Sequence, residues 1–202
     1  IRFFNKKDND IHVSYSFNNF LLKSPGDIKN YVEQFSTEDE IEFKNKLGID
    51  TKKKIALIAG DPGDTYNSKE HKFLSEYYSL LDLKNFSDYH TILKLHPQDK
   101  TSISRLAKKY ANNKNVTISS DIDIYKCLAL SDIVISKYST VVLEAIILKK
   151  FVILTNFDNA SFYKYAVEYK VAHFANGAND VKQLIINKEN LGAGISRNKG
   201  IK

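Results

Sequence analysis

A serine and threonine pair followed by a glutamate is the strongest chemical signal in the chain. Ser139 and Thr140 stand where a helix is expected to begin, and Glu144 lies one turn further along the same helix face. The first amides of a helix and its dipole attract anions, so the two hydroxyls are placed to serve a phosphate. Residues 141–148 are otherwise apolar, which predicts a buried Glu144 carboxylate that needs a partner such as a ribose diol. The alternative is structural: Ser139 only caps the helix, and Glu144 bonds to neighbouring backbone.

A histidine and proline pair is the second candidate. His96 and Pro97 close an apolar run that reads ILKLHP. An imidazolium at the end of a buried strand can hold a phosphate and stabilise the charge on a departing nucleotide, while proline fixes the exit of the chain. A satisfied structural histidine is the alternative, because a lone histidine after a strand is more often of that kind.

The third candidate is a glycine-containing turn at residues 60–64, GDPGD. Gly60 lets backbone approach a ligand closely. The run matches neither the dinucleotide-binding fingerprint nor the phosphate-binding loop of nucleotide triphosphatases. A dinucleotide oxidoreductase and a nucleotide triphosphatase are therefore both disfavoured. No strand ends in a clear acceptor aspartate, so a response regulator is also disfavoured.

Composition narrows the function classes. The 202 residues are 43% hydrophobic and 27% charged, and no run is long enough to span a bilayer. The net charge of +6 comes almost entirely from scattered lysines, whereas nucleic-acid sites favour arginine, so no nucleic-acid partner is expected. The main interpretation of this charge is a solvated, lysine-rich surface, and attraction to an anionic membrane or an acidic polymer is the alternative. Cys127 is the only cysteine and reads as a core residue, and no Cys/His cluster has metal-ligand spacing.

The elements that must position these residues alternate regularly after Lys54. Short strands, apolar on both faces, are separated by helical patterns, which predicts an α/β fold with a doubly wound parallel sheet, Rossmann-like in character. Ligands bind at the carboxyl ends of such strands. The expected strands are 55–59, 89–95, 116–118, 133–135 and 151–154, and the expected helices are 73–81, 102–110, 124–130, 139–148, 162–167 and 181–186.

The remaining segments divide the chain. Residues 1–50 are expected to be a linker and a docking helix, with a short strand at 11–15 and a loop at 24–27. Thr37 and Glu40 predict a capping box for a helix that ends at Leu47 and is closed by Gly48. Residues 51–190 form the expected nucleotide-binding domain, and residues 191–202 a flexible tail or a crossing to another domain.

The order of the motifs resembles a known family. The runs ILKLHP and IDIYKCLALSDIVISKYSTVVLEAIILKKFVIL are similar to the C-terminal domain of two-Rossmann-domain (GT-B) glycosyltransferases, in the group of CDP-glycerol glycerophosphotransferases, capsule-polysaccharide biosynthesis proteins and bacterial His-Pro-motif sialyltransferases. The likeness covers residues 54 to about 187. Lys137 departs from the aspartate that glycerophosphotransferases often carry, and Phe151 from the usual proline. The matching residues are Lys94, His96, Pro97, Leu128, Ser131, Asp132, Ile135, Tyr138, Ser139, Thr140, Glu144 and Ala145.

The resemblance implies roles for these residues. His96 would contact the donor's phosphates and assist departure of the leaving group, Ser139 and Thr140 would bind phosphate, and Glu144 would hold the ribose. The full set of expected nucleotide- and phosphate-binding residues is Gly60, Lys94, His96, Pro97, Ser136, Tyr138, Ser139, Thr140 and Glu144.

The implied function is that of a nucleotide-donor-binding domain acting on a CMP-, CDP- or UDP-activated donor in capsule or teichoic acid synthesis, without a cofactor or metal. Its partners would be that donor and an N-terminal Rossmann domain carrying the acceptor site and general base, so the chain alone is expected to be inactive. The expected location is the cytoplasm, at the inner face of the membrane. The alternatives are a non-catalytic interaction module with a degenerate site and a relative of the sugar-nucleotide 2-epimerases, which carry a Ser-Gly-Gly run that is missing here.

Overall fold

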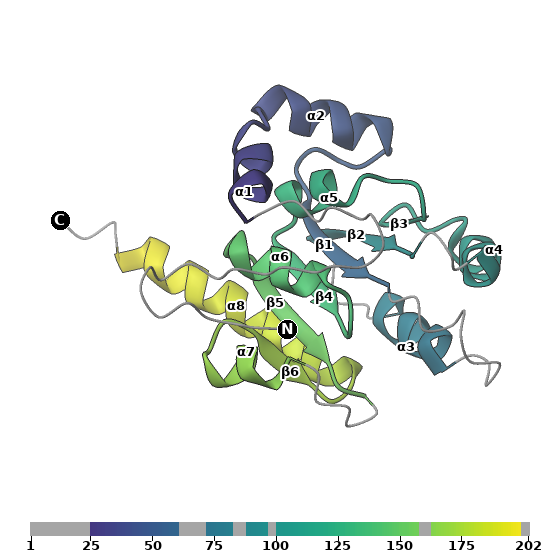
Figure 1. Ribbon diagram of the computed structural model, residues 1–202. Coiled ribbons are helices and arrows are strands. Elements are labelled where there is room, and N and C mark those ends of the chain that lie inside the picture. The colour runs from purple at the N-terminus through teal and green to yellow at the C-terminus, as the bar shows by residue number, and fades with distance from the viewer. Residues whose placement is uncertain (1–24, 61–71, 83–87, 97–99, 158–162, 199–202) are drawn as a thin grey trace.

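The computed structural model describes residues 25–60, 72–82, 88–96, 100–157 and 163–198. These residues form a six-stranded, fully parallel sheet in the order β3-β2-β1-β4-β5-β6, with helices on both faces (Figure 1). The predicted doubly wound α/β fold is therefore confirmed. The strands are β1 Lys54–Ala59, β2 Tyr89–Lys94, β3 Val116–Ser119, β4 Ile133–Ser136, β5 Phe151–Thr155 and β6 His173–Ala175. The helices are α1 Pro25–Glu33, α2 Thr37–Lys46, α3 Lys72–Leu81, α4 Lys100–Tyr110, α5 Ile124–Leu130, α6 Val141–Ile147, α7 Lys164–Glu168 and α8 Ala178–Asn198.

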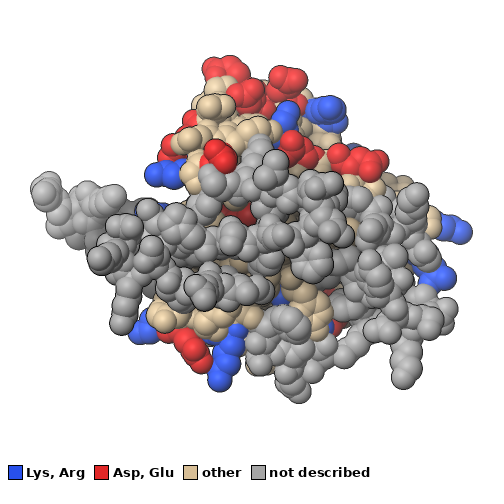
Figure 2. Space-filling model, in the orientation of Figure 1, with Lys and Arg blue, Asp and Glu red and all other residues tan. Residues whose placement is uncertain are grey.

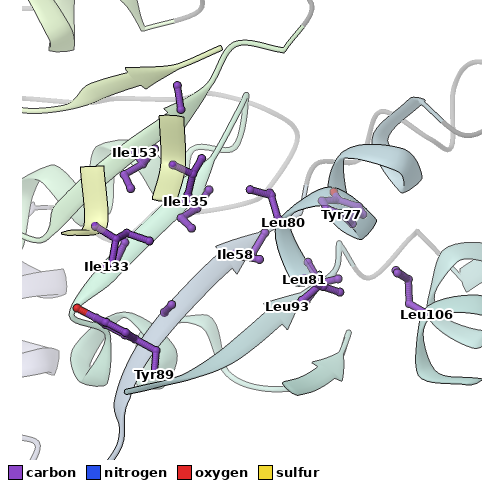
Figure 3. Packing of buried hydrophobic residues seen from close by; sticks show 14 of the residues in the cluster. Ile58, Tyr77, Leu80, Leu81, Tyr89, Leu93, Leu106, Ile133, Ile135 and Ile153 are labelled. Atoms are coloured by element: carbon purple, nitrogen blue, oxygen red, sulfur yellow. The ribbon is translucent and has the colours of Figure 1, made fainter. Parts of the chain in front are cut away.

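The strands are apolar on both faces because each face is covered by helices. In β1, Ala56 and Ile58 pack on one side with side chains of α3, α4 and α8. Figure 3 shows Ile58 among isoleucines of β4 and β5 and leucines of α3. Ile55 and Leu57 point to the other side, against α2, α5, α6 and α7. Cys127 is fully buried in this second layer, and burial raises the pKa of its thiol to about 12, so it is a core residue and not a nucleophile.

In the described part of the chain, which starts at Pro25, α1 and α2 precede the first strand, and Figure 1 shows them at the top of the view. The predicted capping box is wrong by one residue. The N-cap of α2 is Ser36, which has extended backbone, and Asp39 completes the box in place of Glu40. Gly48 follows this helix at φ +67°. The loop expected at 24–27 is also wrong from Pro25 onward, where α1 begins, and the strand expected at 11–15 lies outside the described residues.

The C-terminal helix is longer than the pattern predicted. α8 starts at Ala178 and continues through residues 191–198, a segment that was expected to be either a flexible tail or a crossing to another domain. Glu189 ties the middle of α8 to the sheet, because its carboxylate pairs with Lys54 and accepts a hydrogen bond from Tyr89 at the starts of β1 and β2. None of the helices in the described segments, including α8 with its 21 residues, has the length and apolarity required to cross a membrane.

Candidate functional site

The strand order brings the predicted residues to one edge of the sheet. β1 and β4 are neighbours, and from them the chain proceeds outward in opposite directions, to β2 and β3 on one side and to β5 and β6 on the other. Doubly wound sheets bind ligands at the carboxyl ends of the strands beside such a switch. Gly60 follows β1, the half-buried His96 follows β2, and Ser136 ends β4, so three separate segments meet there. Pro97 lies outside the described residues.

Contacts within the fold explain the presence of Gly60 and of Ser136. The Ser136 hydroxyl donates to the carbonyl of Ala59 at 3.0 Å and so ties β4 to β1 at the switch. A Cβ on Gly60 would lie 2.9 Å from the hydroxyl oxygen of Tyr77, so the space beside it is filled by α3. Their contact with a ligand stays a prediction.

The side chain of Lys94 is buried and links the ends of two neighbouring strands. Its ammonium donates to the carbonyl of Leu95 at 3.1 Å and to that of Ser120 at 2.6 Å, which joins the exits of β2 and β3. Burial lowers the pKa of the ammonium. Since an ammonium has three donors, at most one remains for a ligand.

The loop from β4 to α6 is held from two sides. On one side the Lys137 ammonium forms a buried ion pair with Glu76 of α3 at 3.2 Å. On the other side the hydroxyl of Tyr163 donates to the carbonyls of Tyr138 and Ser139, both at 3.2 Å. The lysine that departs from the family pattern therefore has a partner within the fold. Sequence reasoning missed Glu76 and Tyr163, because both are distant along the chain.

The helix α6 begins one residue later than a cap at Ser139 would place it. Thr140 occupies the N-cap position with helical backbone, is exposed, and makes no side-chain cap. The Ser139 hydroxyl still accepts a hydrogen bond from the amide of Val141 at 3.3 Å. Ser139 thus caps the helix from one position further upstream, with part of its hydroxyl's bonding capacity in use.

Glu144 is buried, as predicted, with 8% of its surface exposed. Burial raises the pKa of its carboxyl, and a hydrogen bond from Tyr125 of α5 opposes that rise. Burial and the Glu144 charge raise the pKa of Tyr125 to about 12, so the phenol stays a donor at neutral pH. Tyr31 of α1 packs edge-on against Tyr125 at 5.7 Å. The sequence predicted that the carboxylate needs a partner but did not identify this tyrosine.

Asn156 adds a polar group at the same edge, directly after β5. Its side-chain nitrogen donates to Asn176 at 3.0 Å, while its side-chain oxygen is buried without a hydrogen-bond partner among the described residues. An unpaired buried acceptor beside a candidate site is a position that a ligand donor can satisfy.

A cavity of about 480 Å³ lies next to this edge, between α2 and the loop that follows β3. Its charge is mainly negative, which does not suit a phosphate. Within the described residues no group of three His, Cys, Asp or Glu side chains is placed to hold a metal ion. The ionisable residues that line the cavity are Asp39, Glu42, Asp121, Asp123, Lys46 and Lys126.

Comparison with known proteins gives one family and one fold. Residues 29–185 match the family described as CDP-Glycerol:Poly(glycerophosphate) glycerophosphotransferase. Among curated proteins, no sequence matches the chain.

Solved structures share the fold at low identity. The wall teichoic acid polymerase TagF is 19% identical, with a TM-score of 0.56, over 78% of this chain and 40% of that one. The UDP-GlcNAc 2-epimerase from Methanocaldococcus jannaschii is 17% identical, with a TM-score of 0.58, over 77% of this chain and 43% of that one. The Neisseria meningitidis enzyme of the same name, solved with UDP-GlcNAc, is 15% identical, with a TM-score of 0.57, over 82% of this chain and 44% of that one. The chain thus spans less than half the length of these neighbours.

Proposed function

Because the chain belongs to the CDP-glycerol:poly(glycerophosphate) glycerophosphotransferase family, we propose that it is the donor-binding half of a transferase that builds a surface polysaccharide. The carboxyl edge of its sheet holds a donor activated with CMP, CDP or UDP, and the family's description favours CDP. The acceptor and the general base belong to a second Rossmann domain outside this chain, so the isolated chain binds nucleotide and transfers nothing.

In the proposed transfer reaction, the donor-binding half of the enzyme stabilises charge and forms no covalent bond with the substrate. In glycerophosphoryl transfer from a CDP-activated donor, an acceptor hydroxyl attacks the phosphorus that carries the glycerol. The bond from that phosphorus to the bridging oxygen breaks, CMP leaves with the electron pair, and the acceptor's proton passes to a base. Groups that meet the charge developing on the leaving nucleotide accelerate this step. In this proposal those groups are His96, the hydroxyls of Ser139 and Thr140, and the amides that open α6.

The observation that carries the proposal is the buried carboxylate of Glu144. Tyr125 supplies one hydrogen bond, whereas an ionised carboxylate has about four acceptor positions. A glutamine would keep the Tyr125 bond without the cost of burying a charge. A ribose diol offers two hydroxyl donors, which a carboxylate accepts and a glutamine amide accepts less well. The presence of an acid at this position, where a glutamine would be less costly to bury, therefore supports a ribose ligand.

Calorimetric titration with CMP, CDP, UMP and UDP tests the proposal. We expect saturable binding of one nucleotide to the wild-type chain and at least a tenfold weaker affinity in Glu144→Ala and in His96→Ala. The matched control is Glu168→Ala, since Glu168 is exposed on α7 and forms only a surface pair with Lys164. An unchanged dissociation constant in Glu144→Ala would overturn the assignment of the ribose site.

An interaction module with a degenerate site is the second candidate. It is favoured by the internal bonds of Lys94 and Ser136, which explain these residues without a ligand. Failure of the full-length protein to bind any of the four nucleotides, with the fold intact, would select this function. Transfer by the isolated chain would contradict both candidates.

A further inference from the structure

A second cavity, of about 490 Å³, lies at the opposite end of the sheet. It is lined by residues at the starts of strands: Asp132 precedes β4, Phe151 opens β5, and His173 opens β6. Because the strands are parallel, this end is remote from the carboxyl edge that carries His96 and Ser139. We call it the amino-edge pocket. None of the residues assigned to the donor site lines it.

The amino-edge pocket is strongly basic. Lys149, Lys150, Lys170 and Lys188 line it, against the single carboxylate of Asp132. Among the residues that the structure describes, no carboxylate forms an ion pair with Lys149 or Lys170. Four ammonium groups and one carboxylate leave an excess of positive charge for a ligand to neutralise.

The other charged groups of the amino-edge pocket already take part in hydrogen bonds or ion pairs within the fold. The Asp132 carboxylate accepts a hydrogen bond from the amide of Ile55 at 3.0 Å. The Lys150 ammonium donates to the carbonyl of Ala129 at 2.8 Å. Lys188 lies 3.7 Å from Glu189, but that carboxylate is also bound by Lys54 at 2.5 Å. The wall is completed by the exposed His173, whose ring stacks on Phe151 with 4.7 Å between the ring centroids, and partial desolvation lowers the pKa of this histidine.

Backbone geometry marks two of these lysines independently. Lys149 and Lys170 have φ of 54° and 60°, and each follows the last turn of a helix, α6 and α7. Glycine is the usual residue at such a left-handed helix end, because side chains are strained there. The chain places glycine at the corresponding end of α2, where Gly48 has φ of 67°. At the two helix ends that border the pocket it keeps lysine despite the strain, which indicates that the ammonium groups serve a purpose.

We propose that the amino-edge pocket binds a phosphate-bearing anion with at least two negative charges, at a site separate from the donor site. Lysine serves as a point-charge ligand for phosphate. Several ammonium groups around one cavity should bind a phosphate dianion or a diphosphate more tightly than they bind a ligand with a single carboxylate. The volume lies within the usual range for small-molecule sites. A soluble phosphate compound and a phospholipid headgroup share this chemistry, so the experiment separates them.

The test uses a variant that preserves the fold. In Lys149→Gly/Lys170→Gly both replacements relieve backbone strain, so we expect the Tm to rise by about 2 °C for each. The control is Lys52→Gln/Lys114→Gln, which removes the same charge from two exposed lysines elsewhere. Inorganic pyrophosphate is the soluble probe. Because pyrophosphate also suits the predicted donor site, binding is located by acetylation of individual lysines, read by mass spectrometry.

Pyrophosphate is expected to protect Lys149 and Lys170 from acetylation at least threefold in the wild-type chain, with no protection of Lys52 or Lys114. Vesicles of phosphatidylglycerol, compared with phosphatidylcholine, give the second arm. Protection by pyrophosphate alone identifies a soluble ligand. Sedimentation with the anionic vesicles that is lost in the glycine variant and kept in the control identifies a headgroup. Absence of both effects, or equal effects at the control lysines, would overturn the proposal.

Discussion

At the scale of single residues, Gly60 shows how tightly the end of β1 is packed. A Cβ at this position would lie 2.9 Å from the Tyr77 hydroxyl and 3.3 Å from the backbone of Leu95. We expect Gly60→Ala to lower the free energy of unfolding by about 1–3 kcal/mol, because the extra methyl overpacks the site. Adding Tyr77→Phe removes the nearest oxygen and should recover part of that loss. Urea unfolding of both single variants and the double variant measures the coupling, and strictly additive losses would show that the two groups do not collide.

Glu144 gives a prediction about pH. Its carboxyl has a pKa raised by burial, so the folded state holds the proton more tightly than the unfolded chain does. The associated stability is therefore present at low pH and is lost as the pH rises through the folded-state pKa. Glu144→Gln should raise the free energy of unfolding by about 1 kcal/mol at pH 7, and the difference should vanish below about pH 4, where Glu144 is protonated in the folded and the unfolded chain. Glu168→Gln, at an exposed position, is expected to show no such change.

The sequence was sufficient to predict the burial of Glu144, because apolar neighbours surround it along the helix. It was not sufficient to identify Tyr125 as its partner, or Tyr163 as the support of the Ser139 carbonyl. Both contacts join elements whose relative placement depends on the strand order. Periodicity reports which face of an element is buried, but not what lies opposite that face.

At the scale of elements, α3 and the exit of β4 are joined by a buried ion pair. Lys137 and Glu76 have side chains only 2% and 8% exposed. Breaking a buried ion pair by removing one partner is strongly destabilising, so Glu76→Gln and Lys137→Met should each lower the free energy of unfolding by about 3–5 kcal/mol. The double variant Glu76→Gln/Lys137→Met removes both charges and should cost less than the sum of the two single variants. A double variant that loses the sum of both costs would contradict this account of Lys137.

Element boundaries show where local patterns stop being informative. The five expected strands are present, because each is a short apolar run between polar ends. The sixth strand, β6, was missed because its three residues, His173–Ala175, are too few to show a period of their own. They become a strand by pairing with β5. The cap of α2 shifted by one residue because Ser36 and Asp39 fit a capping box as well as Thr37 and Glu40 do.

At the scale of the whole molecule, charged side chains are unevenly distributed over the surface. Acidic side chains gather at the top of the view in Figure 2, over the N-terminal helices. The first turn of α2 alone carries Glu38, Asp39 and Glu40. The amino-edge pocket is basic instead. The overall charge of +6 therefore describes neither surface, and composition alone could not have located the pocket.

The fold and the family of this chain followed from the order of its motifs, whereas the ligand contacts of the carboxyl edge stay predictions. The central claim is that the carboxyl edge binds a nucleotide through an acid that is kept at a cost in stability.

Thermal unfolding of the wild-type chain and of Glu144→Gln, each with and without excess CDP, tests that claim most directly. A ligand that binds only the folded state raises the Tm, by about 5 °C when its concentration is about a hundred times the dissociation constant. We predict that CDP raises the Tm of the wild-type chain, while Glu144→Gln starts from a higher Tm and gains at most about half as much from the same CDP concentration, because its affinity is at least tenfold weaker. An equal rise in both proteins, or a lower starting Tm in the glutamine variant, would contradict the account.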